Sequence, residues 1–157
     1  MRGFIDKELR RLDVRYIPQM KTILLALLVA APVALADPEI VALTILGEAR
    51  GESPQGQLAI GCIIKQRAAN RGLTYDQVCL QRKQFSCWNG KTKADLKHML
   101  KLPQAKLAMW IAHNIHRLDT AKIGHADHYH ADYVDPYWAD AAKVTVKIGR
   151  HIFYKLK

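Results

Sequence analysis

The strongest constraint on the fold is the helical spacing of apolar residues in segments that open at a proline. The first such segment covers residues 38–50, and proline suits the first turn of a helix. Val41, Ile45 and Glu48 share one face of this helix, because residues four and seven positions apart are neighbours on a helix surface. Gly51 ends the pattern. The segment therefore predicts a helix with a carboxyl group near the C-terminal end of its apolar face.

The rest of the chain predicts further helices and a small β element. The same signals predict helices over residues 53–70, 74–80, 92–100, 103–118 and 136–143. Residues 84–90 have no helical period and predict a loop or short strand that ends in an Asn-Gly turn. Residues 128–134 predict a strand, and residues 144–148 with 152–154 predict a hairpin. The expected fold is mainly α (α+β), a single helical domain with a small β-hairpin element.

The N-terminal region resembles an export signal. Residues 20–36 contain Lys21, an apolar run over residues 23–33 and an Ala-Leu-Ala end, the three parts of a secretory signal peptide. Cleavage after Ala36 leaves residues 37–157 as the mature domain, with no stable membrane span. A buried core helix and a short membrane anchor are the alternative interpretations. Residues 1–19 are an N-terminal extension, either a long n-region or the result of a start misplaced ahead of Met20.

The net charge of residues 37–157 indicates which class of partner the protein binds. Residues 37–157 contain 18 Lys and Arg against 11 Asp and Glu, a net charge of +7. A basic surface favours anionic polymers, of which nucleic acid and bacterial cell wall are both examples. The export signal favours the wall over nucleic acid. We therefore expect an exported protein, periplasmic or associated with the cell wall, and no nucleic-acid partner.

The cysteines suggest a disulfide. Cys79 and Cys87 flank a predicted turn, and an exported chain meets an oxidising compartment, so these two residues form the expected pair. Cys62 falls in an apolar helical pattern and is expected to be a small buried residue. The alternative is that all three thiols are free. A zinc site is less favoured, because the chain has no Cys-x-x-Cys pair.

Glu48 is the main catalytic candidate. Partial burial raises a carboxyl pKa, and a carboxylic acid that keeps its proton near neutral pH can donate it to a leaving glycosidic oxygen. The alternative is a solvated Glu at a helix end. Most glycosidases use two carboxyl groups, and Glu52 is four residues further on. Gly51 and Pro54 are expected to break the helix between them, so Glu52 is also a candidate for a structural role.

The segment from His125 to Asp132 offers a second chemistry. Its three histidines and two aspartates are candidate metal ligands for a metal-dependent amidase, although no standard zinc spacing is present. In a strand, His128 and His130 share one face, whereas Tyr129 lies on the other. We favour a polar cleft wall over a metal site. A non-catalytic module that binds wall polymers through its charge and aromatic residues is a further alternative.

Five motifs in order resemble the cell wall hydrolase family that includes the catalytic domain of spore cortex-lytic enzymes. They are Leu46–Glu52, Gly56-Gln57, Gln84–Trp88, His128–His130 with Pro136 and Trp138, and Ile148–Tyr154. The resemblance covers nearly all of residues 40–154. At the His-Tyr-His motif, the chain resembles the Gram-negative and phage relatives of the family more than the spore enzymes. Both a periplasmic wall-remodelling enzyme and a phage lysis protein are compatible with the resemblance.

The resemblance implies a lysozyme-like catalytic domain that acts on peptidoglycan. It implies lytic transglycosylase chemistry, with Glu48 as the acid and then the base. The C6 hydroxyl of the substrate closes a 1,6-anhydro ring in that chemistry, so no second carboxylate is required. No cofactor and no metal are expected, and we expect a monomer. The candidate substrate-binding residues are Tyr129, His130, Phe85, Trp88 and Glu52.

Overall fold

The computed structural model describes residues 37–139 and 142–156. The α-helices are α3 (Pro38–Ala49), α4 (Pro54–Arg71), α5 (Tyr75–Leu80), α6 (Lys93–Leu96) and α7 (Ala105–His113). The 3-10 helices are η3 (Ser86–Trp88), η4 (Lys97–Lys101), η5 (Ile115–Arg117) and η6 (Thr120–Ile123). The strands are β1 (His128–Ala131), β2 (Lys143–Ile148) and β3 (His151–Lys155). The predicted signal peptide lies outside the described residues. Within them, no helix has both the length and the apolar character needed to cross a membrane.

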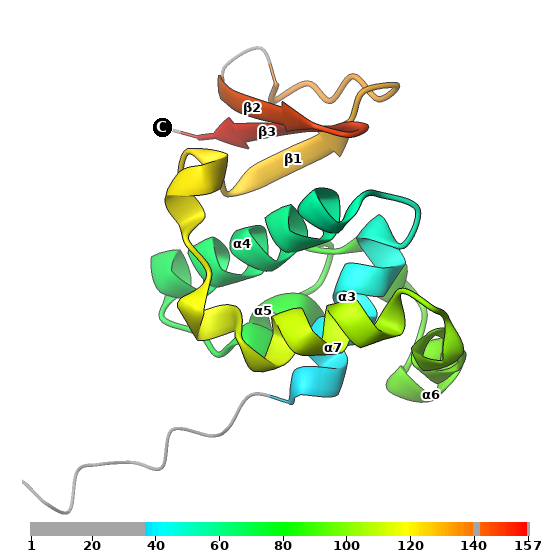
Figure 1. Cartoon of the computed structure of the whole chain (residues 1–157). Helices are drawn as coiled ribbons and strands as arrows, with labels where there is room; N and C mark the ends of the chain where they lie inside the picture. The colour runs from blue at the N-terminus through cyan, green and yellow to red at the C-terminus, as the bar shows by residue number, and fades with distance from the viewer. Residues whose placement is uncertain (1–36, 140–141, 157) are drawn as a thin grey trace, which may run out of the picture. The chain divides into compact units, whose positions relative to one another are not determined.

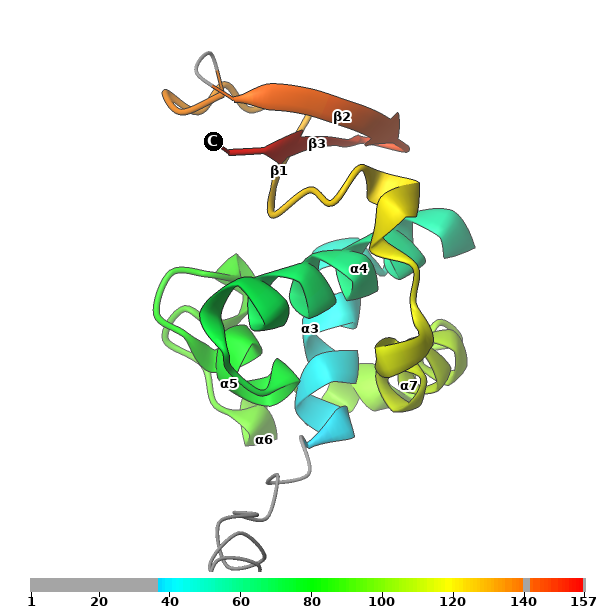
Figure 2. The ribbon, with the colours of Figure 1, turned by 90° about the vertical axis from the view of Figure 1, so that its left-hand side faces the viewer.

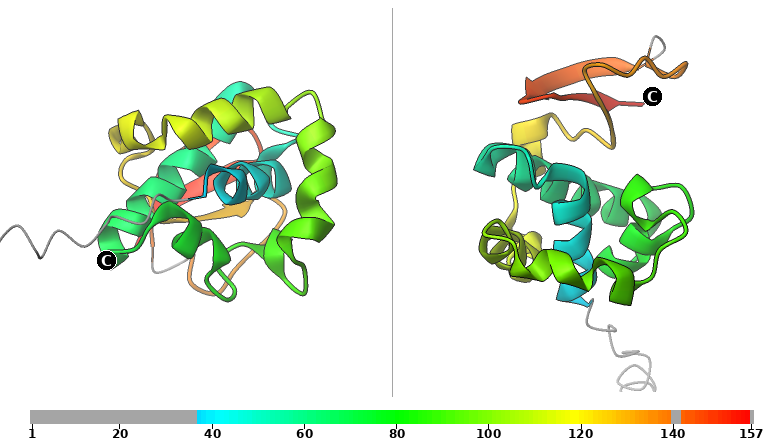
Figure 3. Two further views of the ribbon diagram at one scale, coloured as in Figure 1. Left: turned by 90° about the horizontal axis from the view of Figure 1, so that it is seen from below. Right: turned by 90° about the vertical axis from the view of Figure 1, so that its right-hand side faces the viewer.

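Helix α3 is the central element of the helical layer. Viewed along its axis, it is surrounded by the other helices (Figure 3, left). Its residues from Ile40 to Leu46 are all buried, as expected for a helix that is apolar on every side. The Asp37 side chain caps its start by accepting a hydrogen bond of 2.9 Å from the Glu39 N–H. A fixed central helix gives its C-terminal residues a defined position.

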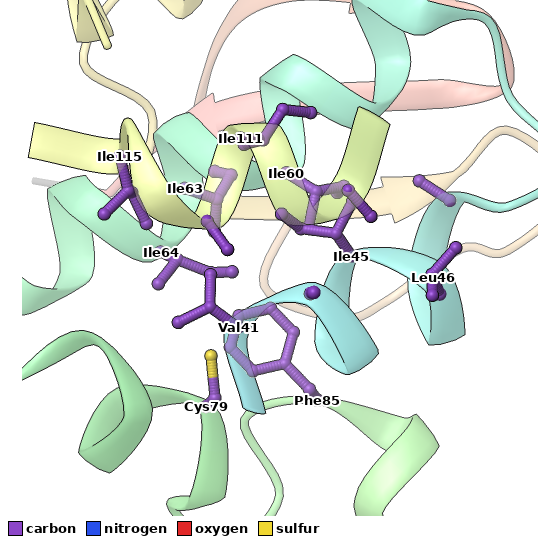
Figure 4. Packing of buried hydrophobic residues seen from close by; sticks show 14 of the residues in the cluster. Val41, Ile45, Leu46, Ile60, Ile63, Ile64, Cys79, Phe85, Ile111 and Ile115 are labelled. Atoms are coloured by element: carbon purple, nitrogen blue, oxygen red, sulfur yellow. The ribbon is translucent and has the colours of Figure 1, made fainter. Parts of the chain in front are cut away.

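Helix α4 lies between the sheet and the other helices, as two perpendicular views show (Figures 1 and 2). The Ser53 side chain caps its start, and Gly72 ends it in the left-handed conformation that favours glycine. Its apolar residues Ile60, Ile63 and Ile64 are fully buried and pack with residues of α3 and α7 in one core (Figure 4). Burial of this core is the main favourable term in folding.

The β element is a three-stranded antiparallel sheet with the order β1-β3-β2. Strand β1 pairs with β3, so that Tyr129 lies opposite Phe153. Strands β2 and β3 form a hairpin whose turn contains Gly149 at φ 57°. The central strand of this sheet therefore comes from the end of the chain, and it holds β1 beside the helical layer.

The predicted fold class is confirmed: the chain is mainly α with a small β element. The differences concern the end of one helix, the absence of another and the type of one turn. The helix predicted over residues 103–118 ends at His113, and a separate 3-10 turn follows it. The described part of the 136–143 segment contains no helix: residues 137–138 form a turn, and Lys143 begins strand β2. Residues 86–88 form a 3-10 turn where we expected a loop or strand.

The predicted Cys79–Cys87 disulfide is wrong, since the cysteines of the described region, Cys62 included, are all free. The Cys79 thiol is fully buried in the core, close to Phe85 and Val41 (Figure 4). Cys87 packs instead against Gly47 of α3, where a methyl group on that glycine would lie 2.7 Å from the sulfur. The sequence spacing was compatible with a disulfide, but each thiol has its own packing partner on α3 or in the core. Burial raises the pKa of Cys79 to about 12, so this thiol is inert as a nucleophile.

Candidate active site

Glu48 lies in the last turn of α3, at the end of the helix that points toward the sheet (Figure 1). The residue is half-buried, between the buried neighbours of the helix and the exposed Arg50. Its position is set by the sequence of α3, because the neighbouring Leu46 and Ala49 are part of the buried core. The carboxyl group is thus fixed to a rigid element and still reaches the protein surface.

Three donors hold the Glu48 carboxyl group. The Tyr129 hydroxyl of β1 donates to Oε2 at 2.8 Å. The Cys87 N–H donates to Oε1 at 3.1 Å, and the Ser86 hydroxyl donates to the same oxygen at 3.3 Å. Two segments that are far apart in sequence, η3 and β1, therefore meet at one side chain of α3. Hydrogen bonds to a charged group are among the stronger ones, so this arrangement fixes the orientation of the carboxyl group.

Tyr129 remains a hydrogen-bond donor over the whole practical pH range. Burial is the main cause that raises its pKa well above the usual value, and the charge and hydrogen bond of Glu48 add to the effect. The neutral phenol keeps its proton and continues to donate a hydrogen bond to Glu48. Its ring is stacked on Phe153 at a centroid distance of 5.8 Å, and it meets His151 edge-on at 5.1 Å. The phenol is therefore held from the side of the sheet.

A pocket of about 360 Å³ opens beside Glu48. It is lined by the end of α3, the residues that follow it, and the edge of the sheet. The residues are Gly47, Glu48, Arg50, Gly51, Glu52, Ala131, Tyr133, Arg150 and His151. This set places two carboxyl groups, two guanidinium groups and an exposed tyrosine around one space that a polar ligand can enter.

A buried arginine joins the two segments that hold Glu48. Arg67 of α4 is 6% exposed, and its Nε donates to the Asp127 carbonyl at 2.7 Å while Nη1 donates to the Gln84 carbonyl at 3.0 Å. Its guanidinium lies 4.9 Å from the ring centre of Phe85 and 5.9 Å from that of Tyr129. Asp127 precedes β1 and Gln84 precedes η3. Arg67 thus ties together the backbone just before each set of donors to Glu48.

The chain belongs to the cell wall hydrolase family. The family model for cell wall hydrolases matches residues 51–154, which is most of the described region. The match begins three residues after Glu48. No curated protein matches the chain.

Two solved structures are similar to the chain. One is the catalytic domain of the germination-specific lytic transglycosylase SleB from Bacillus anthracis, with 24% identity, 80% of this chain and 100% of that chain covered, and a TM-score of 0.60. The other is the catalytic domain of the Bacillus cereus SleB protein, with 26% identity, 80% and 95% coverage, and a TM-score of 0.57. The fold of this family member is thus the fold of those catalytic domains.

Glu52 lies in the same pocket as Glu48 but has a partner of its own. Its Oε2 accepts a hydrogen bond of 3.2 Å from the Arg150 N–H in the turn between β2 and β3. Its carboxyl group fills the space where a side chain on Gly149 would stand. The hydrogen-bond partner of Glu52 is therefore the β2–β3 turn. Glu52 thus joins the hairpin to the pocket.

Tyr129 and His130 lie on opposite faces of β1. Tyr129 faces Glu48. On the opposite face, His130 Nε2 and the Tyr154 hydroxyl form a hydrogen bond of 2.7 Å, and the His130 ring packs against Trp138. The alternation of side chains along a strand requires this separation. The structure therefore brings Tyr129 to the Glu48 carboxyl group and places His130 in an aromatic cluster on the far face of the sheet.

Phe85 and Trp88 flank the Glu48 donors Ser86 and Cys87 in the chain. Phe85 is 1% exposed, and its ring packs under Arg67 and beside Cys79 (Figure 4). Trp88 is half-buried, and its indole N–H donates to Thr44 Oγ1 at 2.9 Å. Both residues line a second pocket, of about 500 Å³. Trp88 presents surface to that pocket, whereas Phe85 mainly supports the segment from beneath.

The histidine-rich segment does not converge on one point. His128 pairs with Asp127, His130 with Tyr154, and His125 with Thr120. Across residues 37–139 and 142–156, no group of three His, Cys, Asp or Glu side chains is placed to hold a metal ion. These histidines serve hydrogen bonds within the loop and sheet.

Sequence reasoning missed Arg67 and His151. Arg67 had a signal, because it follows Ile60, Ile63 and Ile64 on one helical face, and a charged residue on a buried face needs buried partners. His151 lies within the Ile148–Tyr154 motif, but nothing in that motif indicates that its side chain lines the pocket. Burial lowers the pKa of His151 and so favours its neutral form.

Proposed function

We propose that this cell wall hydrolase is an exported lytic transglycosylase that cleaves the glycan strands of peptidoglycan. The family match and the similar SleB catalytic domains support a peptidoglycan-lytic enzyme. The observation that carries the specific mechanism is the Glu48 carboxyl group, fixed by three donors at the mouth of a polar pocket.

Glu48 acts first as a general acid in this proposal. The protonated carboxyl group gives its proton to the glycosidic oxygen, and the bond between that oxygen and the sugar C1 breaks. The resulting carboxylate then takes the proton of the C6 hydroxyl of the same sugar. The C6 oxygen bonds to C1 and closes the 1,6-anhydro ring. Protons and bonds balance without water and without a second carboxylate.

The surrounding groups favour this single-carboxylate scheme. Tyr129, Ser86 and the Cys87 N–H keep the carboxyl group oriented in both protonation states, because hydroxyl oxygens also accept hydrogen bonds. Glu52 is engaged with the Arg150 N–H, so we assign it to positioning of the pocket wall. Inverting glycosidases instead place a second carboxylate so that it activates a water molecule.

Substrate contacts are proposed for both sides of Glu48. Glu52 lines the first pocket, Tyr129 contacts the Glu48 carboxyl group, and Trp88 lines the second pocket with Phe85 behind it. A glycan strand that passes Glu48 would contact both surfaces. His130 acts in this scheme through the packing of the sheet. Export through residues 20–36 places the enzyme where its polymer is, and we propose a mature monomer of residues 37–157 without cofactor.

Release of soluble fragments from purified sacculi tests the proposed role of Glu48. The wild-type protein is expected to release muropeptides, and Glu48→Gln, which keeps the shape but not the proton, is expected to release less than about a hundredth as much. Glu39→Gln is the matched control, because Glu39 lies at the other end of α3. Full activity of folded Glu48→Gln would show that the role is assigned to the wrong residue.

A further inference from the structure

The second pocket is a basic site lined by Trp88, the residue that follows the Glu48 donor Cys87. It has a volume of about 500 Å³ and is lined by eight residues, none of them acidic. Arg82 and Lys83 supply two positive charges to it, and both side chains are exposed. Neither residue forms an ion pair within the part of the chain that the structure describes. These two charges are therefore available to a ligand.

The Trp88 ring, which forms part of the wall of this pocket, has a fixed position. The Trp88 indole N–H donates to Thr44 Oγ1, and that hydroxyl donates to the Ile40 carbonyl at 2.8 Å inside α3. The ring is thus held by the central helix and presents a constant surface to the pocket. Lys83 has a left-handed φ of 64°, which makes the tight turn between α5 and the segment that leads to η3.

The pocket is continuous in sequence with the groups that hold Glu48. Cys87 donates its N–H to Glu48, and the next residue, Trp88, lines the pocket. Because Cys87 and Trp88 are adjacent in the 3-10 turn η3, a polymer that extends from Glu48 along η3 meets this surface. An aromatic face next to cationic groups suits a sugar ring that carries a carboxylate.

We propose that this pocket binds carboxylate groups attached to the muramic acid of the glycan strand, through Arg82 and Lys83 beside Trp88. This inference rests on the proposed peptidoglycan substrate. The sugar rings of the strand are themselves uncharged. The negative charge of the strand comes from stem-peptide carboxylates, or from the lactyl carboxylate where the peptide has been removed. Both sources present the same chemistry to a guanidinium and an ammonium group.

Binding to chemically different sacculi tests the proposal without any turnover. The protein carries Glu48→Gln, and the variant adds Arg82→Gln and Lys83→Gln. Three polymers are compared by co-sedimentation at low salt: native sacculi, sacculi with amidated stem carboxylates, and strands stripped of peptide. Lys97→Gln with Lys101→Gln is the control for net charge, because these exposed residues of η4 do not line the pocket.

The proposal predicts that the Arg82/Lys83 variant binds native sacculi, stripped strands or both about three- to tenfold more weakly than the control variant. The polymer that shows the loss identifies the carboxylate. Binding to amidated sacculi should be equal for the two variants, and the difference should shrink at high salt. Equal binding of the two variants to all polymers, or an equal loss on amidated sacculi, would overturn the proposal.

Catalysis gives a second readout that separates this inference from the proposed function. In the active enzyme, Arg82→Gln with Lys83→Gln should raise KM for the carboxylate-bearing polymer about three- to tenfold and leave kcat within about twofold. If the wild-type enzyme releases no anhydro products but the binding difference is present, the proposed chemistry fails and the carboxylate site stands. An unchanged KM in an enzyme that does release them overturns the site alone.

Discussion

At the scale of single residues, the main candidate for catalysis is one carboxyl group with three donors. Glu48 alone is an unremarkable half-buried residue at a helix end. Its neighbours give it a role, because Tyr129 fixes Oε2 while Ser86 and Cys87 fix Oε1. The side chain therefore has a single orientation toward the pocket.

Loss of the Tyr129 hydroxyl should damage turnover more than substrate binding. Tyr129→Phe keeps the ring stacked on Phe153 but removes the 2.8 Å hydrogen bond to Glu48. A hydrogen bond to a charged group contributes about 1.5–3 kcal/mol, so kcat should fall about ten- to a hundredfold. KM should stay within about twofold. Steady-state kinetics on soluble glycan strands measure both, with the exposed Tyr137→Phe as control. A variant with wild-type kcat would refute the role of this hydroxyl.

Arg67 should act on turnover through the donors that it aligns. Arg67→Met retains most of the packing but leaves the Asp127 and Gln84 carbonyls without their donor. We expect kcat to fall at least tenfold, together with a stability loss of about 3 kcal/mol for the broken buried network.

A purely structural role for Arg67 would lower the melting temperature and leave the kcat of the folded enzyme unchanged. Arg67→Lys should recover part of the loss in kcat, because an ammonium group can still donate to one of the two carbonyls. Arg71→Met, on the exposed next turn of α4, is the control and should change neither quantity by much. Kinetics and thermal unfolding of the three variants separate these outcomes.

At the scale of elements, the candidate active site forms where α3, η3 and β1 meet. The contact between α3 and η3 is close, because Gly47 leaves room for Cys87 to pack on the helix. The contact between α3 and β1 depends on pairing with β3, which comes from the end of the chain. Neither contact is local in sequence.

Gly47→Ala should separate η3 from α3. An added methyl group would lie 2.7 Å from the Cys87 sulfur, so the η3 backbone must move and carry the Ser86 and Cys87 donors away from Glu48. We expect a stability loss of about 1–3 kcal/mol and a kcat at least tenfold lower. For stability, Gly51→Ala is the matched control, since nothing lies within 4 Å of its added methyl group. Equal stability of the two variants in denaturant unfolding, or a wild-type kcat for Gly47→Ala, would show that Gly47 does not keep η3 in place.

The helices were predictable from the sequence and the site was predictable only in part. Proline, serine and glycine mark the ends of α3 and α4, and these local signals placed both helices within a few residues. The 103–118 segment kept its apolar spacing beyond His113, yet the backbone changes to a 3-10 turn there. Sequence spacing does not report that change, because tertiary packing decides where a helix ends.

The partners of Glu48 show why the rest of the site was not predictable. Strand alternation already separated Tyr129 from His130, but the face that meets α3 depends on the register with β3. The Cys79–Cys87 prediction was wrong because spacing along the chain does not show that the two thiols pack on different neighbours. Long-range packing, which no local pattern encodes, fixed both outcomes.

At the scale of the whole molecule, the chain has a net positive charge, and the wall of its polar pocket contains the buried His151. Residues 37–157 have a net charge of +7, which suits an anionic polymer as substrate. His151 is 8% exposed, and its Nδ1 has no hydrogen-bond partner in the described residues. Protonation of this histidine in the folded state is therefore unfavourable.

Stability should decline as the pH falls below about 6.5. Burial lowers the pKa of His151 in the folded state from 6.5, so the unfolded chain takes up the proton first and is favoured. The loss is complete once the pH is below the lowered folded-state pKa. Melting temperatures across this range should fall for the wild type and fall less for His151→Gln. His113→Gln, at an exposed position, is the control and should follow the wild type. An identical pH dependence for all three would rule out His151 as the source.

The central claim is that the C6 hydroxyl of the sugar, and not water, attacks C1 under the control of Glu48. Sacculi are digested in water labelled with heavy oxygen, and the released muropeptides are measured by mass spectrometry. The account predicts 1,6-anhydro products that contain no label, formed by the wild type and lost in Glu48→Gln. Reducing-end products that carry one labelled oxygen would show hydrolysis by water and would contradict it.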